Sequence, residues 1–184
     1  MRRVMKTCAF TGNRPDKLPW GYDENDARCR RVKREIYLAA KQAVNDGYNR
    51  FICGMAQGGD TYFAEAVLAL KAEYDVTLEC AVPYSRQSLS WSDAAKKRYE
   101  RILALADKVT VFEEHYTPWC YHRRNRYMVD SAQRLIALSR AQSGGTKYTI
   151  EYAVAKNIEI IYVDCEKKVV KHPQNSLQTV YKRI

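Results

Sequence analysis

The chain has 184 residues, with 31 Lys and Arg against 21 Asp and Glu, and 46% of its residues are hydrophobic. This composition is that of an ordinary globular protein and excludes wholesale disorder and collagen-like structure. The length predicts one domain over 1–184, with a core over about 4–163 and a charged C-terminal tail over 164–184. No apolar run reaches the roughly 18 residues of a membrane-spanning helix, so we expect no membrane partner.

The first residues and the cysteines predict a cytoplasmic protein. The opening MRRVMK is basic, but the polar run TCAFTGNRPDK follows too soon for a signal peptide. The six cysteines are scattered singly without a C-x-x-C pair, which favours free and mostly buried thiols. His115, Cys120 and His122 share one predicted loop but lack a matching fourth ligand, so we expect no metal and no cofactor.

The formal net charge of +10 fits three kinds of protein: one that binds nucleic acid, one that binds a small anion, and one with a solvated basic surface. The basic residues cluster on two predicted helices and in the tail. These clusters are Arg28, Arg30, Arg31, Lys33 and Arg34, then Arg123, Arg124 and Arg126, then Lys167, Lys168 and Lys171. The sequence has no helix-turn-helix, zinc-finger or RNP motif, so DNA binding is the lesser hypothesis.

Short apolar runs alternate with helical periods along the chain. The runs predict strands at 4–10, 51–53, 76–82, 109–112, 134–138 and 158–163, and an extra strand at 168–170 in the tail. Apolar spacings of three and four predict helices at 26–46, 61–74, 92–106, 125–132 and 147–156. Because such strands need parallel crossovers, we predict an α/β, Rossmann-like doubly wound fold. Its mainly parallel sheet has about six strands, with helices on both faces.

Three of the predicted strands end in glycines or small polar residues. The three turns are Thr11-Gly12-Asn13-Arg14, Gly54 to Asp60, and Ser143-Gly144-Gly145-Thr146. Glycine lets the main chain approach a ligand closely, and the free N–H groups at a helix start attract a phosphate or carboxylate. Ligands of open parallel sheets lie beyond the carboxyl ends of the strands. We therefore predict that the three turns converge into one site for an anion or nucleotide, although each alone could be only a tight turn.

None of the turns matches a familiar phosphate motif. The chain has no G-x-x-x-x-G-K-[ST] sequence, and no G-x-G-x-x-G follows its first strand, which disfavours P-loop ATP hydrolysis and hydride transfer. Asp60 begins a predicted helix, where it would cap the N-terminus or hold ribose hydroxyls rather than phosphate. The phosphate is then expected at Gly144, Gly145 and Thr146, where the next acidic residue is Glu151.

Three segments together carry a family resemblance. They are the opening FTGNRP, CGMAQGGDTYFAEAV (53–67) and NRYMVDSAQRLIALSRAQSGGTKYTIEYA (125–153). These motifs, in this order, resemble the SLOG superfamily, which includes the DNA-processing protein DprA and the LOG phosphoribohydrolases. They are similar in particular to its small bacterial YpsA/YoqJ-like branch, over about residues 4–163. The resemblance implies a Rossmann-like domain that binds a nucleotide or nucleotide-derived small molecule, as a sensor or a small nucleotide-processing protein.

The resemblance leaves further functions open. LOG enzymes cleave the N-glycosidic bond of a nucleoside monophosphate with an Arg and a Glu whose positions match Arg124 and Glu151. A carboxylate can stabilise an oxocarbenium-like ribose, and an Arg can bind phosphate with two hydrogen bonds. The loop here lacks the leading Pro and the second G-T pair of that family. These departures disfavour hydrolysis but leave binding intact. The chain could also bind single-stranded DNA as DprA does, or serve as a scaffold that keeps the fold without a ligand.

The candidate site residues come from the three turns and the helices beside them. The ligand-binding candidates are Thr11, Gly12, Arg14, Gly54, Gly58, Gly59, Asp60, Glu65, Arg126, Gly144, Gly145 and Thr146, and the catalytic candidates are Arg124 and Glu151. Glu65 lies one helical turn beyond Asp60, so both could face the cleft. Tyr116, Trp119 and Tyr121 follow the fourth predicted strand and could stack on a base. The chain could also form a homo-oligomer.

Overall fold

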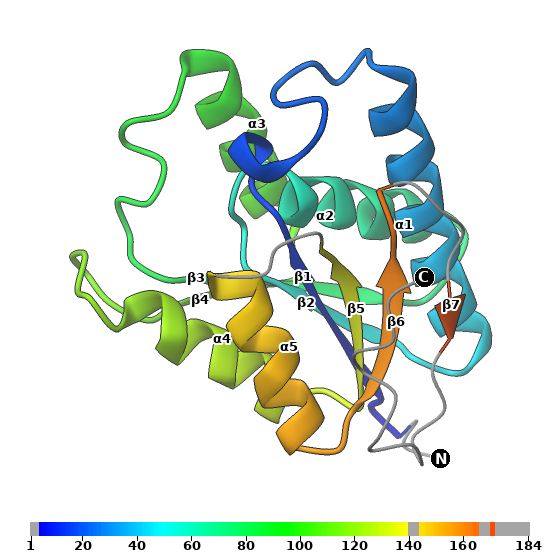
Figure 1. Cartoon of the computed structure of the whole chain (residues 1–184). Coiled ribbons are helices and arrows are strands. Elements are labelled where there is room, and N and C mark those ends of the chain that lie inside the picture. Colours follow the sequence, from blue (N-terminus) through cyan, green and yellow to red (C-terminus); the bar gives the residue numbers. More distant parts are fainter. Residues whose placement is uncertain (1–3, 140–143, 166–169, 172–184) are drawn as a thin grey trace.

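The computed structural model describes residues 4–139, 144–165 and 170–171. Its centre is a seven-stranded sheet with helices packed against it (Figure 1). The strands are β1 (Thr7–Gly12), β2 (Arg50–Cys53), β3 (Thr77–Val82), β4 (Lys108–Val111), β5 (Arg134–Leu138), β6 (Glu159–Val163) and β7 (Val170–Lys171). Their order is β4-β3-β2-β1-β5-β6-β7. The strands β1 to β6 are parallel, and β7 pairs with β6 in the antiparallel direction. The predicted Rossmann-like fold with a mainly parallel sheet is confirmed.

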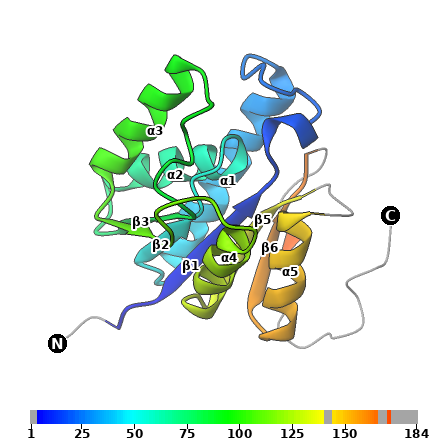
Figure 2. The ribbon, with the colours of Figure 1, turned by 90° about the vertical axis from the view of Figure 1, so that its left-hand side faces the viewer.

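Five α-helices and one short 3₁₀ helix connect the strands within the described residues. They are η1 (Pro15–Lys17), α1 (Ala27–Asn45), α2 (Gly59–Leu70), α3 (Asp93–Leu105), α4 (Cys120–Asp130) and α5 (Gly145–Ala155). The helices α1, α2 and α3 cover one face of the sheet, and α4 and α5 cover the other (Figure 2). The molecule therefore has three layers, as a doubly wound sheet requires.

Side chains of the central strands alternate between the two faces of the sheet. In β1, Cys8 and Phe10 belong to the core under α1–α3, and Ala9 belongs to the core under α4 and α5. The ring of Phe10 stacks on Phe63 of α2 with ring centroids 4.6 Å apart. Three alanines, one each from β1, β3 and β5, form much of the opposite face: Ala9, Ala81 and Ala137. The small size of Ala9 and Ala81 leaves room for α4 to pack directly on β1 and β3.

Three helices begin earlier than the apolar spacing predicts. The helix α2 begins at Gly59 instead of 61, α4 begins at Cys120 instead of 125, and α5 begins at Gly145 instead of 147. The buried stripe of α4 runs through Cys120, Arg124 and Met128, at steps of four. Because Arg124 is a buried cation in the place of an apolar residue, the hydrophobic period is interrupted and the first turn cannot be recognised from the spacing.

The tail prediction falls partly outside the described residues. The strand expected at 168–170 overlaps β7 only at Val170, while 166–169 and 172–184 are not described. None of the described helices is both long and apolar enough to cross a lipid bilayer.

The strand order changes direction between β1 and β5. From β1 the chain continues outward through β2, β3 and β4, and it then returns to β5 on the other side of β1 and continues to β6. The register pairs Gly12 with Leu138 at the carboxyl ends of β1 and β5. A crevice at this switch point is where doubly wound sheets bind ligands.

Candidate functional site

The structure brings the three predicted turns together at the carboxyl end of β1. The backbone N–H of Asn13 donates to the carbonyl of Leu138 at 3.1 Å, and the N–H of Gly59 donates to the carbonyl of Asn13 at 3.1 Å. From α5, the Thr146 hydroxyl donates to the carbonyl of Gly12 at 3.2 Å. The end of β1 is therefore hydrogen-bonded to β5, to the start of α2 and to the start of α5.

Two of the glycines are required by this close approach. A Cβ atom on Gly59 would lie 3.0 Å from the Cα of Gly12, so the backbones of β1 and α2 are in contact. Gly58 has φ +87°, a left-handed conformation that favours glycine, and a Cβ there would lie 2.8 Å from the carbonyl oxygen of Asn13. These positions explain the paired glycines of the second turn.

A cavity of about 630 Å³ opens at this junction, and we call it the first lobe. Its lining includes Gly12, Asn13, Lys17, Arg124, Gly145 and Thr146. The volume lies within the range of about 300–1,000 Å³ that is typical of small-molecule sites. Of the predicted site residues, Thr11, Gly12, Arg14, Asp60, Arg124, Gly144, Gly145 and Thr146 line this lobe.

The N-terminus of α5 forms one wall of the first lobe. Gly144 is its N-cap residue with φ +93°, and among the described residues no side chain accepts a hydrogen bond from the first N–H groups of the helix. The ammonium of Lys17 lies against Gly144, because a Cβ there would be 2.8 Å from Nζ. A helix N-terminus beside a lysine is a positively charged surface that suits an anion.

Arg124 and Asp60 form a buried pair that also lines the first lobe. Arg124 donates to the carbonyl of Gly54, and its Nη1 lies 3.9 Å from Oδ2 of Asp60. Both residues are about 5% exposed. A Cβ on Gly54 would lie 1.7 Å from Nη1, so glycine makes the space for this guanidinium. The position of Arg124 depends on glycine in the turn after β2.

Burial shifts the pKa values of both members of this pair. Loss of solvation raises the pKa of Asp60, although Arg124 opposes the change, and the same loss lowers the pKa of Arg124. The expectation that Asp60 caps α2 is wrong, because Gly58 is the N-cap residue. Asp60 instead accepts a hydrogen bond from the N–H of Ala56 at 3.0 Å, and this bond stabilises the turn before the helix.

Asn13 is a buried polar side chain without a partner among the described residues. It is 1% exposed and lines the first lobe, and neither Nδ2 nor Oδ1 of its amide has a hydrogen-bond partner there. Leaving such a group unsatisfied costs about 1–3 kcal/mol. Sequence reasoning gave Asn13 no role of its own, although its place between Gly12 and Arg14 in the strand-end motif was a usable signal.

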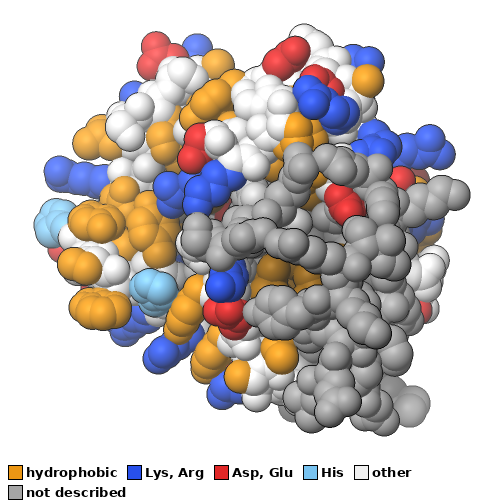
Figure 3. Space-filling view, in the orientation of Figure 1, with side chains coloured by type: hydrophobic (Ala, Val, Ile, Leu, Met, Phe, Trp, Pro, Cys, Tyr) orange, Lys and Arg blue, Asp and Glu red, His pale blue; other side chains and the backbone are white. Residues whose placement is uncertain are grey.

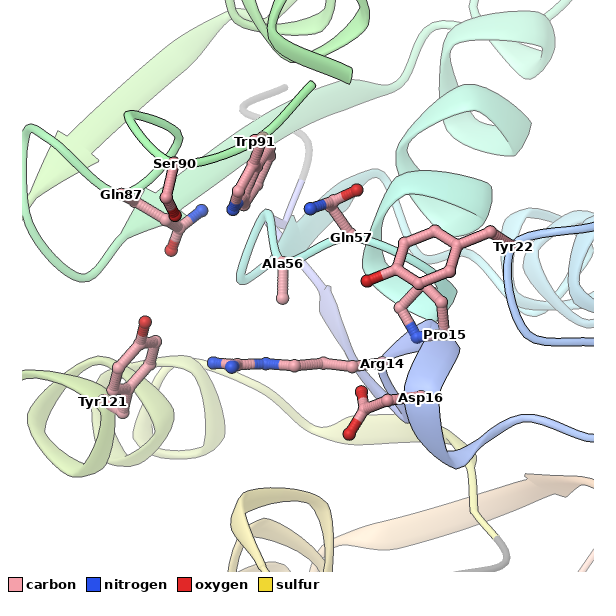
Figure 4. A pocket seen from close by; sticks show the side chains of 10 residues that line it. All are labelled: Arg14, Pro15, Asp16, Tyr22, Ala56, Gln57, Gln87, Ser90, Trp91 and Tyr121. Carbon is pink, nitrogen blue, oxygen red and sulfur yellow. The ribbon is translucent and has the colours of Figure 1, made fainter. Parts of the chain in front are cut away.

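A second cavity of about 350 Å³ adjoins the first, and we call it the second lobe (Figure 4). Residues that line this lobe and not the first include Tyr22, Gln57, Gln87, Ser90 and Trp91. Four residues line both lobes: Arg14, Asp16, Ala56 and Tyr121. The guanidinium of Arg14 lies 5.1 Å from the centroid of the Tyr121 ring, a cation–π contact at the boundary between the lobes.

Glu65 does not line either lobe. Its carboxylate lies 2.6 Å from Nη2 of Arg98 and 3.1 Å from Nη2 of Arg101. Both arginines belong to α3, so Glu65 joins α2 to its neighbouring helix instead of facing the cavity with Asp60.

Two more predicted site residues lie on the outer surfaces of α4 and α5. The Nε of Arg126 donates to the Tyr148 hydroxyl at 2.6 Å, and Glu151 lies 3.4 Å from Nζ of Lys147. Neither lines a lobe. Arg124 faces the first lobe and Glu151 does not, so the structure does not bring the two candidate catalytic residues together there.

The predicted aromatic cluster is divided. Tyr121 lines both lobes, but Tyr116 and Trp119 are 61% and 73% exposed. Figure 3 shows hydrophobic side chains gathered, with histidine beside them, where the loop before α4 reaches the surface. No group of three His, Cys, Asp or Glu side chains that could hold a metal gathers within the described ranges.

The fold and the crevice at its switch point define a Rossmann-like α/β protein with a polar, glycine-lined cavity. The family model described as "YspA SLOG family" (YpsA) matches residues 8–167, and the chain belongs to this family. It is 27% identical to a UPF0398 protein of Oceanobacillus iheyensis, over 78% of this chain and 79% of that protein. It is 25% identical to the UPF0398 protein YpsA of Bacillus subtilis, over 79% of this chain and 83% of that one.

Two solved structures share the fold. DNA processing protein A (DprA) of Streptococcus pneumoniae matches with a TM-score of 0.58 and 15% identity, over 86% of this chain and 50% of that one. DprA of Helicobacter pylori, described for its single-stranded DNA binding mode, matches with the same score and identity, over 85% and 64%. The chain therefore spans between half and two thirds of these proteins.

Proposed function

We propose that the protein binds a nucleotide-derived small molecule, with the phosphate of the ligand at the N-terminus of α5 in the first lobe. The observation that carries this proposal is the wall formed by Gly144, Gly145 and Lys17, which lines the same lobe as Asn13 with its unpartnered amide. Backbone N–H groups and an ammonium bind phosphate oxygens, and the amide supplies both a donor and an acceptor for the rest of the ligand.

The charges around the first lobe support an anionic ligand. Lys17 and Arg14 are exposed at its rim and Arg124 is buried in its wall. Asp60 is already balanced by Arg124, so the remaining charge is positive except for Asp16. Hydrolysis is not part of this proposal, because Glu151 pairs with Lys147 outside the lobe.

The test is a thermal-shift titration of the full chain with nucleoside mono- and diphosphates, dinucleotides and ADP-ribose. A ligand at a hundredfold excess over its Kd adds about 2.7 kcal/mol, or roughly 5–10 °C in Tm for a chain of this size. We expect Gly145→Val to abolish the shift without unfolding the protein, because a Cβ there would meet only Asn125 Nδ2, at 3.7 Å.

A matched control is Ala155→Val, which places the same side chain at the other end of α5 and should keep the shift. If none of these ligands raises Tm by more than about 1 °C, or if Gly145→Val responds as the wild type does, the proposal is wrong.

Binding of single-stranded DNA is the second candidate, favoured by the exposed Tyr116 and Trp119 near the first lobe. Aromatic rings of this kind stack on successive bases, and each stack is worth about 1–3 kcal/mol. Labelled oligo(dT) should then bind with an affinity that falls steeply between about 50 mM and 200 mM salt. Trp119→Ala should weaken that binding about tenfold, whereas Leu89→Ala, also at an exposed apolar residue, should not. Weak binding that does not change with salt would exclude this candidate.

A further inference from the structure

The second lobe contains polar and aromatic groups that the proposed phosphate site does not use. From its lining we infer that it is a subsite for the base of the ligand, so that the ligand is a nucleoside 5′-phosphate with its phosphate in the first lobe and its planar base in the second. This inference rests on the proposed function for the phosphate position. It adds the chemical class of the other half of the ligand.

Gln87 provides the first argument. Its residue is 4% exposed, and its Nε2 donates to the carbonyl of Met55 at 2.5 Å. That bond fixes the orientation of the amide, and it leaves Oε1 buried without a partner among the described residues. An immobilised amide oxygen that faces a cavity is an acceptor for an N–H group, and every common nucleobase carries an N–H or NH₂ donor on its edge.

The aromatic rings of the lobe provide the second argument. Trp91 is half-buried, and its indole packs edge-on against Tyr99 at 5.3 Å, which holds the ring in place. In Figure 4 the side chains of Trp91 and Gln87 lie across the lobe from Arg14 and Tyr121. A lobe with a fixed aromatic ring beside a fixed amide suits a flat heteroaromatic group, which can stack and form hydrogen bonds at its edge simultaneously.

The boundary between the lobes suits the sugar of such a ligand. Arg14 and Asp16 line both lobes, and Asp16 is exposed at the mouth. A carboxylate between a phosphate site and a base site can accept hydrogen bonds from ribose hydroxyls, as acidic residues do in dinucleotide-binding sheets. A second phosphate is disfavoured at this point by the same negative charge.

The experiment compares ligands with and without a base on the full chain by calorimetry. The probes are ribose 5-phosphate, the four common ribonucleoside 5′-mono- and diphosphates, and a short single-stranded oligonucleotide. We expect at least one nucleotide to bind about tenfold or more tightly than ribose 5-phosphate. Trp91→Ala should remove about tenfold of that nucleotide affinity, a typical loss for one stacked base, and leave the affinity for ribose 5-phosphate within twofold.

Further variants separate recognition of the base from damage to the fold. Trp91→Phe keeps a ring on Tyr99 and should retain most of the nucleotide affinity. Gln87→Met removes the acceptor, together with the hydrogen bond to the carbonyl of Met55, with little change in volume, and should weaken only the nucleotides. The matched control is Leu89→Ala, which removes an exposed apolar side chain outside both lobes and should change neither affinity.

The outcomes are distinct for the two proposals. If ribose 5-phosphate binds as tightly as every nucleotide, or if Trp91→Ala and Gln87→Met weaken all probes equally, the base subsite is refuted and the phosphate site stands. If neither ribose 5-phosphate nor any nucleotide binds, the base subsite for a nucleoside 5′-phosphate is refuted, and if the dinucleotides and ADP-ribose of the thermal-shift titration fail too, the proposed function fails with it. If the oligonucleotide binds far more tightly than any free nucleotide, the assignment to a free nucleotide is wrong.

Discussion

Replacement of Glu79 by glutamine tests how the sheet is stabilised at the end away from the lobes. Glu79 lies on β3 under α4 and is 1% exposed. Its carboxylate lies 2.5 Å from Nη2 of Arg50 and 3.1 Å from Nζ of Lys108. It also accepts hydrogen bonds from the hydroxyls of Thr110 and Tyr127, each at 2.7 Å. Glu79→Gln keeps the shape of the side chain but removes the charge that these groups surround.

The expected magnitude follows from the pKa of Glu79. Burial by itself would raise this pKa, but the hydrogen bonds from Arg50, Thr110 and Tyr127 outweigh burial and lower it from 4.5 to about 2. At 1.36 kcal/mol for each pH unit, this lowering is worth about 3 kcal/mol of folding free energy. Because the folded pKa is the lower one, the contribution is complete above about pH 4.5 and is lost as the pH falls toward 2.

The measurement is urea unfolding of the wild type and Glu79→Gln at several pH values between 7 and 3. We expect Glu79→Gln to be about 3 kcal/mol less stable at pH 7, and the difference to shrink as the pH falls below 4.5. The control is Glu114→Gln, at a carboxylate that is 85% exposed, which should be near neutral. A difference below about 1 kcal/mol at pH 7, or one that does not change down to pH 3, would refute this reasoning.

Three further predictions concern the glycines and the candidate acid. Gly54→Ala should displace Arg124 and leave Asp60 without its counter-charge, which should lower the free energy of unfolding by about 3 kcal/mol. An unchanged urea midpoint would contradict this prediction. Gly59→Ala should lower the free energy of unfolding by about 2 kcal/mol in the same assay, because its Cβ would collide with main-chain atoms of Gly12. An unchanged free energy of unfolding would show that the two backbones move apart without cost. Glu151→Ala should change the nucleotide affinity measured by calorimetry by less than twofold relative to the wild type. A tenfold loss would show that the carboxylate takes part in binding.

Most of the fold could be predicted from local patterns because the strands are short apolar runs separated by helical periods. The start of α4 could not, since Arg124 and Asn125 are buried polar residues and interrupt the apolar stripe. The 3₁₀ helix at Pro15–Lys17 was also missed, because a single turn has no hydrophobic period to detect.

The parts of the site that depend on close backbone contacts could be predicted from the sequence, and the parts formed by side chains could not. Close contact between β1 and α2 requires glycine, so Gly12 and Gly59 were visible in the sequence. The second lobe was missed because β3 runs into Pro83 without a glycine, and nothing local marks Gln87 or Trp91. Glu151 lies outside both lobes, because five residues along an α-helix turn its side chain roughly 140° about the axis from Thr146, which lines the first lobe.

The two alanines beneath α4, Ala9 on β1 and Ala81 on β3, have a consequence for the cavity. Their small size lets this helix pack close to the sheet, and the helix carries Arg124 to the carbonyl of Gly54. A bulkier residue at Ala9 or Ala81 would lift the helix and withdraw the guanidinium, although neither lines a lobe. Relatives could therefore come to accept different ligands through substitutions in the interior of the sheet while every residue that contacts the ligand stays the same.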